Sequence, residues 1–261
     1  MYKLQDNLTI LINTEKKLAG NPRLLISDLK LLISTDSSVA ELHNHLNLVI
    51  GSKEDWLPLV SVDTFGFNKQ NGELEILFLY YPELNLPLSS PSSKIIHQKI
   101  GLPQIEQQVS NFPNINPFPY RYFNEVTNIL FCYNDLYTQQ IELEEIKISK
   151  DTSLYFSQGK YCAWSLRNPE LYLSDSINQF PTHESSSFLK EMFKRSLDLI
   201  STNNIKLMEE KNITVYNEVC TLHNTIVKNK EHNKNQGLSI LKSWLFEIID
   251  KFYDDSNDLE N

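Results

Sequence analysis

DTFGFNKQNGELEILFLYYPELNL, residues 63–86, and DTSLYFSQGKYCAWSLRNPELYL, residues 151–173, are two versions of one pattern within this chain. Each begins with an Asp-Thr pair before an apolar segment and carries a turn glycine, Gly72 or Gly159. Each then reaches Pro-Glu-Leu-x-Leu, which begins ten residues after that glycine. Apolar, β-branched and aromatic runs on both sides of turn residues predict β-hairpins. The sequence therefore predicts one hairpin twice, each leaving through a proline-led segment.

The spacing of the two copies predicts a modular chain. They lie 87 residues apart in a chain of 261, which is long enough for two small cores. Prolines at positions 113, 117 and 119 disfavour both helix propagation and strand pairing, and so mark a boundary. We expect an N-terminal helical segment over residues 1–55, α+β units over 56–112 and 113–202, and a C-terminal helical segment over 203–261.

Helices are expected before and after these hairpins. Asn21 and Pro22 form a typical helix start, and Ser38 with Glu41 forms a capping box. Apolar residues then recur at helical spacing. The pattern predicts helices over residues 22–33, 38–51, 94–112, 186–200, 215–226 and 238–252. The fold class predicted is thus α+β, with helical ends and two small antiparallel sheet units, each followed by a helix.

Composition limits the partners. The net charge of −9 and pI near 5.2 disfavour non-specific binding to nucleic acid or anionic membranes, which require concentrated Lys and Arg. Three widely spaced cysteines suit a reducing compartment. No secretory signal is recognisable, and no apolar run approaches the roughly 20 residues of a membrane helix. We expect a cytoplasmic or nuclear protein without cofactors, whose partners are other protein subunits.

The order helix, antiparallel meander, Tyr-Pro exit and helix resembles the RWD and ubiquitin-conjugating-enzyme-like folds. The exit is Tyr81-Pro82 with Pro87 five residues later, one residue longer than the usual YPxxxP of RWD domains. The second copy has Asn168 in place of the tyrosine. The resemblance covers about half of the chain and implies a tandem RWD-like scaffold that binds proteins. The cysteines lack the HPN-type context that a conjugating enzyme requires.

One pattern suggests catalysis. Asp135, followed by Glu145-Ile146-Lys147 between apolar strands, matches the loose Asp…Glu-x-Lys arrangement of PD-(D/E)xK nucleases. In such sites two carboxylates hold Mg²⁺ and the lysine orients the attacking water. Glu-x-Lys also occurs at Glu15 and at Glu209, and alternating charges are typical of the solvated face of an edge strand. We therefore favour the structural interpretation of Asp135, Glu145 and Lys147.

Other polar groups suggest sites with less support. His43 and His45, with His97 as a third ligand, would suit a metal, but residues two apart on a helix do not share a face. Asp63, Glu73 and Glu75 could meet across the first hairpin, although an exposed hairpin end explains them as well. His183-Glu184 is better explained as the approach to a helix cap than as an acid–base pair. We therefore predict no metal site and no catalytic residues.

The last predicted helix has more apolar surface than one stripe needs. Trp244, Phe246 and Phe252 are its aromatic residues and our candidates for partner binding. The sequence as a whole predicts a non-catalytic binding or assembly subunit of an intracellular complex. Two alternatives remain: a Mg²⁺-dependent nuclease, and an acidic immunity or inhibitor protein whose binding to a basic partner would be salt-sensitive.

Overall fold

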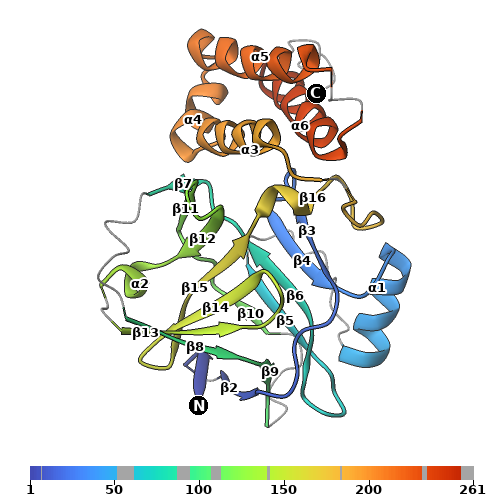
Figure 1. The fold of residues 1–261 in the computed structure, drawn as a ribbon, viewed down its shortest axis with the longest axis vertical. Helices are drawn as coiled ribbons and strands as arrows, with labels where there is room; N and C mark the ends of the chain where they lie inside the picture. Colours follow the sequence, from blue (N-terminus) through green and yellow to red (C-terminus); the bar gives the residue numbers. More distant parts are fainter. Residues whose placement is uncertain are drawn as a thin grey trace.

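The structure is a computed structural model that describes residues 1–6, 8–51, 62–86, 95–106, 113–139, 142–182, 184–230 and 234–253. It comprises β-sheets with a group of helices above them in the view of Figure 1. The N-terminus lies at the end of the molecule away from these helices.

Strands fill most of the first two thirds of the chain, and helices lie mainly in its C-terminal half. The strands are β1 (Tyr2–Gln5), β2 (Leu8–Asn13), β3 (Asn21–Leu25), β4 (Lys30–Ser34), β5 (Asp63–Phe67), β6 (Leu74–Tyr80), β7 (Leu84–Asn85), β8 (Ile95–Ile100), β9 (Leu102–Gln104), β10 (Asn114–Ile115), β11 (Tyr120–Asn124), β12 (Ile129–Tyr133), β13 (Glu142–Lys147), β14 (Thr152–Ser157), β15 (Lys160–Arg167) and β16 (Leu173–Ser174). The helices are α1 (Val39–His45), the π-helical turn η1 (Leu46–Ile50), α2 (Asp135–Gln139), the 3₁₀ turn η3 (Pro169–Tyr172), α3 (Ser187–Leu199), α4 (Thr202–Glu209), α5 (Ile213–Lys228) and α6 (Gln236–Tyr253).

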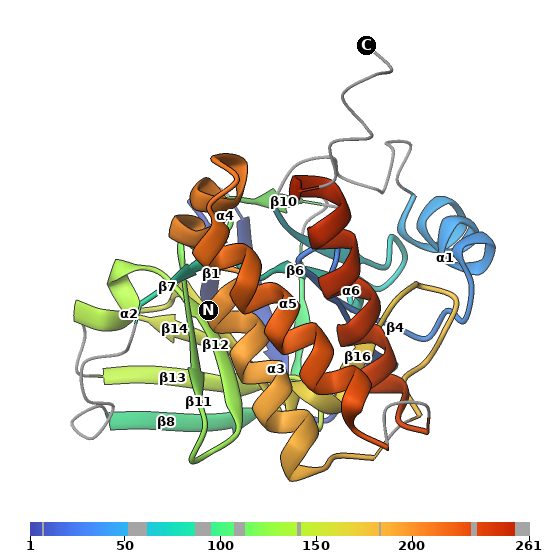
Figure 2. The same ribbon diagram turned by 90° about the horizontal axis from the view of Figure 1, so that it is seen from above.

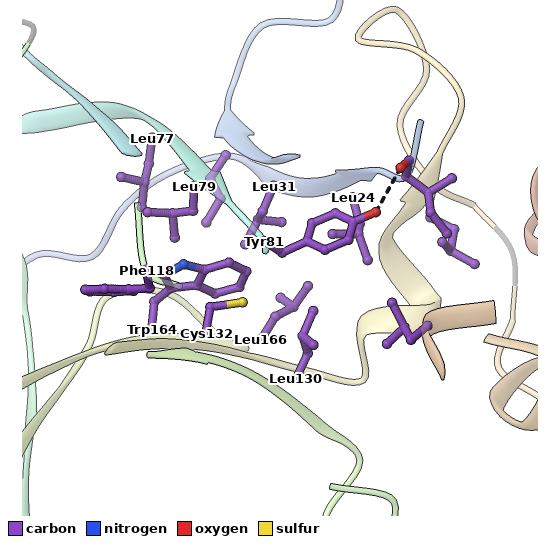
Figure 3. Close-up of a cluster of buried hydrophobic side chains, with 14 of the residues drawn as sticks. Leu24, Leu31, Leu77, Leu79, Tyr81, Phe118, Leu130, Cys132, Trp164 and Leu166 are labelled. Atoms are coloured by element: carbon purple, nitrogen blue, oxygen red, sulfur yellow. Dashed lines mark hydrogen bonds between the residues drawn. The ribbon is translucent and has the colours of Figure 1, made fainter. Parts of the chain in front are cut away.

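These strands form two mixed sheets that share a core. Within the described residues, the ten-stranded sheet contains the path β7-β11-β12-β15-β1-β2-β9, with β14, β13 and β8 branching from β15. The six-stranded sheet has the order β10-β5-β6-β4-β3-β16. Figure 3 shows the apolar layer between them, in which Trp164 and Cys132 of the larger sheet face Leu31 and Leu79 of the smaller.

The predicted N-terminal helical segment is wrong, because residues 1–34 form four strands. The apolar residues of β3 and β4 alternate between two faces: Leu24 and Leu31 face the core between the sheets, whereas Leu25 and Leu32 pack beneath α1 and η1. A strand buried on both faces has continuous apolar runs, and two such runs separated by a short turn imitate helical spacing. The short helix α1 interrupts the strands after Ser38, whose hydroxyl accepts the N–H of Glu41.

The helix predicted over residues 94–112 is also wrong. This segment contains β8 and β9, two parts of one path that meet at Gly101; β8 pairs in parallel with β13, and β9 pairs antiparallel with β2. The series β2, β1, β15, β14, β13 and β8–β9 thereby closes on itself. A Cβ atom at Gly101 would lie 2.4 Å from Cγ2 of Ile12, which explains the glycine at this crossing.

Both predicted hairpins form, and each belongs to a four-stranded unit that occurs twice. The order β5-β6-β4-β3 in the smaller sheet matches β14-β15-β12-β11 in the larger sheet. The register also matches. Lys30 pairs with Tyr80 in the first unit, and Ile129 pairs with Arg167 at the equivalent position of the second unit. The residue pairs that follow along both ladders correspond in the same way. The resemblance seen in the sequence therefore corresponds to repeated strand pairing.

The repeat includes an irregularity. The ladder of β5 and β6 shifts register between Gly66 and Phe67, and the ladder of β14 and β15 shifts between Tyr155 and Phe156, the corresponding position. Thr64 pairs with Phe78 of β6, and Ser153 pairs with Ser165, the equivalent residue of β15. Thr64 therefore corresponds to Ser153 and not to Thr152, so the two Asp-Thr pairs are offset by one residue in the structure. The glycine and the Pro-Glu-Leu positions remain aligned.

The two units exchange strands, and for this reason the predicted fold class of independent modules is wrong. After the first hairpin, β7 crosses to pair in parallel with β11 of the second unit. After the second hairpin, β16 crosses to pair in parallel with β3 of the first unit. Each Pro-Glu-Leu segment thus leads into a short strand that pairs with the other unit, and not into a helix that covers its own sheet.

Helices α3 to α6 form a layer on one side of the sheets (Figures 1 and 2). Ser186, Ser201 and Asn212 cap α3, α4 and α5, each accepting a backbone N–H of the first turn. The apolar faces of these helices join the core that lies between the sheets. Among the described helices, none is both long enough and apolar enough to span a membrane.

Candidate functional site

The proposed nuclease residues lie on a helix and on a strand, and they contact different neighbours. Asp135 begins α2, while Glu145 and Lys147 are two residues apart on β13 and so face the same side. Ser153 donates to one carboxylate oxygen of Glu145 at 2.7 Å, and the amide of Gln98 donates to the other at 2.9 Å. The carboxylate of Glu145 is thus engaged in bonds that connect β8, β13 and β14.

Asp135 and Glu145 have different neighbours. The charge of Asp135 raises the pKa of Tyr120, which places this carboxylate beside β11. Between β11 and β13 lie β12, β15 and β14. Asp135 thus contacts Tyr120, whereas Glu145 is held by Ser153 and Gln98, and no interaction among the described residues joins the two carboxylates as a ligand pair.

The candidate metal ligands are similarly dispersed. His43 and His45 lie on α1, whereas His97 is on β8 at the other side of the sheets (Figure 2). The ring of His45 lies between two carboxylates, with Nδ1 3.0 Å from Asp36 and Nε2 2.7 Å from Glu75, and so connects α1 to β6. No group of three or more His, Cys, Asp or Glu is placed to hold a metal in the part of the chain that the structure describes.

The three carboxylates of the first hairpin point to different partners. Glu73 pairs with Lys16 at 2.7 Å, and Glu75 bonds to the α1 histidine described above. Asp63 is fully buried and accepts the hydroxyl of Tyr161 at 3.2 Å, a bond between the two sheets. The proposed cluster of Asp63, Glu73 and Glu75 therefore does not form.

Burial of Asp63 makes stability depend on pH. Desolvation raises the pKa of this carboxyl to about 8, although the backbone N–H of Tyr80 and the hydroxyl of Tyr161 oppose the shift. The folded state thus holds this proton more tightly than the unfolded chain, so the stabilisation is complete below pH about 4 and is lost as pH rises through about 8. We expect the free energy of unfolding to fall by about 1 kcal/mol per pH unit between pH 5 and 7 because of this group.

Asp63→Asn is the matched test, because an amide preserves the shape without the titration. Urea unfolding at several pH values should show a flatter profile for the variant than for the wild type. Parallel profiles for the two proteins would contradict the assignment of this pH dependence to Asp63.

His183 lies outside the described residues, and Glu184 is exposed. The backbone carbonyl of Glu184 accepts the side-chain amide of Asn235 at 3.1 Å. Glu184 thus lies just before α3, and the proposed pair with His183 lies partly outside the described residues.

The aromatic residues of α6 point in different directions. Trp244 is buried in the core, Phe252 is half-buried, and the side chain of Phe246 is 59% exposed. The ring centroid of Phe246 is 6.4 Å from that of His223 on α5. Of the three candidate partner-binding residues, Phe246 alone offers a large solvent-accessible surface.

An aromatic cluster, in which Tyr133, Tyr137 and Tyr155 are buried, lies on the side of the ten-stranded sheet that faces away from the core between the sheets. One cross-strand row runs through Tyr120, Tyr133, Ala163, Tyr155 and Glu145, which pair in this order from β11 to β13. The residues between them in sequence, such as Cys132 and Trp164, point into the core. Strand periodicity therefore places the tyrosines on the outer side.

A second row lies two residues along. It runs through Tyr122, Phe131, Ser165, Ser153 and Lys147 in the same strand order. Tyr122 and Phe131 are half-buried, so their rings contact both the protein and solvent. Small serines separate these rings from Lys147, so the bulky aromatic side chains are concentrated at the β11–β12 side of the sheet.

Helix α2 covers part of this surface with Tyr137. Its ring centroid lies 5.6 Å from those of Tyr133 and Tyr155, and 6.3 Å from that of Phe131. Burial raises the pKa of Tyr133 to about 12 and also raises that of Tyr137, so both phenols stay neutral at physiological pH. We call the group Tyr120, Tyr122, Phe131, Tyr133, Tyr137 and Tyr155 the aromatic face.

Our reading of the sequence missed the aromatic face, although part of its signal is visible. Tyr120 and Tyr122 alternate along β11, as Phe131 and Tyr133 do along β12. This alternation indicates one aromatic side of a hairpin. Nothing local indicates that β14 and β15 extend the same side.

Comparisons with known proteins give no family for this chain: no family model, no curated protein and no solved structure matches it significantly.

Proposed function

We propose that this protein is a non-catalytic binding or assembly subunit that contacts a protein partner through the aromatic face. The observation that carries the proposal is the half-buried pair Tyr122 and Phe131 beside the packed tyrosines of β11, β12 and α2. Tyrosine provides a large apolar ring and a polar hydroxyl with few rotatable bonds. Such residues are enriched at protein interfaces and among their energetic hot spots.

The surroundings of the aromatic face favour a protein partner. Leu86 and Leu136 are 42% and 36% exposed, and Leu86 lies beside Tyr133, whose hydroxyl donates to its carbonyl. Leu136 belongs to α2 and precedes Tyr137 in sequence. Apolar side chains thus border the aromatic rings, as expected at the centre of an interface.

The polar groups of the same surface favour binding over chemistry. Glu145 is held by donors from two neighbouring strands, whereas Asp135 lies beside Tyr120. Lys147 is in the second row beside Ser153. Because these charged groups contact different neighbours, we infer that this surface acts through apolar contacts with a partner and not through catalysis.

The test is a double variant, Tyr122→Ser with Phe131→Ser. Wild-type protein purified from its native cells is expected to carry a stoichiometric partner, and the double variant should bind the isolated partner roughly tenfold more weakly or worse. The binding of the wild type should change little with salt, because apolar contacts dominate. If binding instead weakens strongly with added salt, the result would favour the alternative hypothesis of an acidic immunity or inhibitor protein that binds a basic partner.

Phe246→Ser is the matched control, since it removes an exposed aromatic ring from the α6 surface. If Phe246→Ser abolishes binding and the double variant does not, the partner-binding residues predicted on α6 are the site. A wild-type protein that is monomeric and has no stoichiometric partner would contradict the proposal. Urea unfolding of all variants separates loss of binding from loss of fold.

A further inference from the structure

Strand β8 forms an open edge of the ten-stranded sheet. It pairs with β13 on one side, and no other described strand pairs with it. Figure 2 shows it as the outermost strand of its side of the molecule. The side chains of Ile96 and Ile100 are 43% and 45% exposed, and those of residues 97–99 are also exposed. An edge with exposed apolar side chains is a template for pairing with a further strand.

The backbone groups at this edge can be assigned from the hydrogen bonds at its end. The N–H of Gly101 donates to Lys147 of β13, so Gly101 faces β13. Leu102, the next residue, pairs with Asn13 of β2 on the opposite side. Because alternate residues of a strand direct their N–H and C=O groups to the same side, Ile96, Gln98 and Ile100 direct theirs away from β13.

No described residue bonds to these outward groups of Ile96, Gln98 and Ile100. They lie in line with β2, which pairs with β9 and then turns away at Asn13. Among the described residues, the unpaired part of this edge therefore begins where β2 ends. A strand antiparallel to β8 placed there would continue the direction of β2.

We propose that β8 pairs with β8 of a second copy of this chain, antiparallel and centred on Gln98. In this register Gln98 lies opposite its own symmetry mate, and Ile96 lies opposite Ile100 of the partner subunit. The three outward-facing residues then pair only among themselves, so their N–H and C=O groups become donors and acceptors for each other. The edge is self-complementary, which is what a two-fold interface requires.

The side chains fit the same arrangement. Ile96 and Ile100 are both on the outer side of the sheet, so two Ile–Ile cross-strand contacts would form symmetrically. On the other side of the sheet, Lys99 is already neutralised by Glu144 at 2.7 Å. The apolar part of this edge is thus Ile96 and Ile100, and Lys147 of β13 lies beside Ile100 on the same side. The inference goes beyond the proposed function, because it uses an edge that does not overlap the aromatic face.

The first test exchanges the Ile96–Ile100 pair for charges. Wild-type protein should be dimeric by sedimentation equilibrium over roughly a hundredfold range of concentration. Ile96→Lys with Ile100→Lys places like charges opposite each other twice and should weaken dimerisation at least about tenfold. Ile96→Lys with Ile100→Glu places opposite charges together twice and should restore the dimer.

Within one chain these two positions are about 13 Å apart, so the introduced lysine and glutamate do not pair with each other inside one subunit. Equal weakening by both double variants would overturn the proposed register. A wild type that is monomeric at every concentration would overturn the proposed dimer. This outcome includes the case in which β8 pairs with a strand of a different protein.

The second test is a cross-link. In the proposed register the Cα atoms of the two Gln98 residues are about 5.5 Å apart, within the range of a disulfide. Gln98→Cys should therefore form a covalent dimer on oxidation. Ile96→Cys should not, because the two introduced thiols would be about 13 Å apart along the strand. Cross-linking of Ile96→Cys without Gln98→Cys would contradict the symmetric arrangement.

Discussion

Arg121→Met is expected to lower the free energy of unfolding by about 3 kcal/mol, a large fraction of the stability of a typical domain. Arg121 lies on β11 and is only 1% exposed. Its Nε donates to Oδ1 of Asn85 at 2.6 Å, and its Nη2 donates to the carbonyls of Leu197 and Ile200 at the end of α3. One guanidinium thus joins the exchanged strand β7 and the helical layer to the larger sheet.

The size of this effect follows from what the substitution leaves behind. Methionine fills most of the space but donates no hydrogen bond. Oδ1 of Asn85 and the carbonyl of Ile200 then lose the donor from Arg121, and the carbonyl of Leu197 keeps only the amide of Asn85 at 3.0 Å. A cation at the C-terminal end of a helix also stabilises the helix dipole. Replacing a buried charge by an apolar group is often neutral when both partners are removed, but here the acceptors remain.

Arg121→Lys and Arg167→Met are the controls. Lysine can reach one of the acceptors but lacks the planar fork, so we expect an intermediate loss. Arg167 is exposed on β15, and its replacement should change stability by less than about 0.5 kcal/mol. Urea unfolding measures all three variants. A loss below about 1 kcal/mol for Arg121→Met would show that the acceptors find water or other donors.

The sequence predicted the hairpins but not the sheets, for a physical reason. Gly72 and Gly159 mark turns, and the alternation beside them is a local signal. The partners of β7 and β16 are distant in sequence, and parallel pairing with a strand of the other unit leaves no local pattern. The helices predicted over residues 22–33 and 94–112 failed for the same reason, since their strands are defined by distant neighbours.

The candidate site was predictable to a similar extent. The aromatic alternation in β11 and β12 is readable, but the aromatic face also needs β15 and β14 as the next strands. The partners of Asp135 and Glu145 are likewise set by contacts distant in sequence, Tyr120 for one carboxylate and Gln98 for the other. Strand order thus decides which side chains meet, and a single sequence does not contain it.

Gly72→Ala is expected to cost about 3 kcal/mol and Gly159→Ala only about 1 kcal/mol, although these glycines are equivalent in the repeat. Both have positive φ, 72° and 75°, so a Cβ atom strains both backbones alike. At Gly72 the added Cβ would lie 2.3 Å from the carbonyl oxygen of Ile105. At Gly159 the nearest atom is the carbonyl oxygen of Met1 at 3.3 Å.

Both variants pay the conformational cost of a side chain at positive φ. The difference between their losses in unfolding free energy therefore measures the contact between the sheets alone. Ile105 follows β9, and its N–H donates to the carbonyl of Gly72 at 2.9 Å, so its backbone cannot retreat without losing that bond. Met1 is 80% exposed and its carbonyl oxygen lies 3.3 Å from the added Cβ, compared with 2.3 Å for the oxygen at Gly72, so a small shift relieves this contact. Urea unfolding of Gly72→Ala, Gly159→Ala and the double variant tests this directly. Equal losses for the two single variants would mean that Ile105 shifts freely, and that the tip of the first hairpin is not fixed against the closed series of strands.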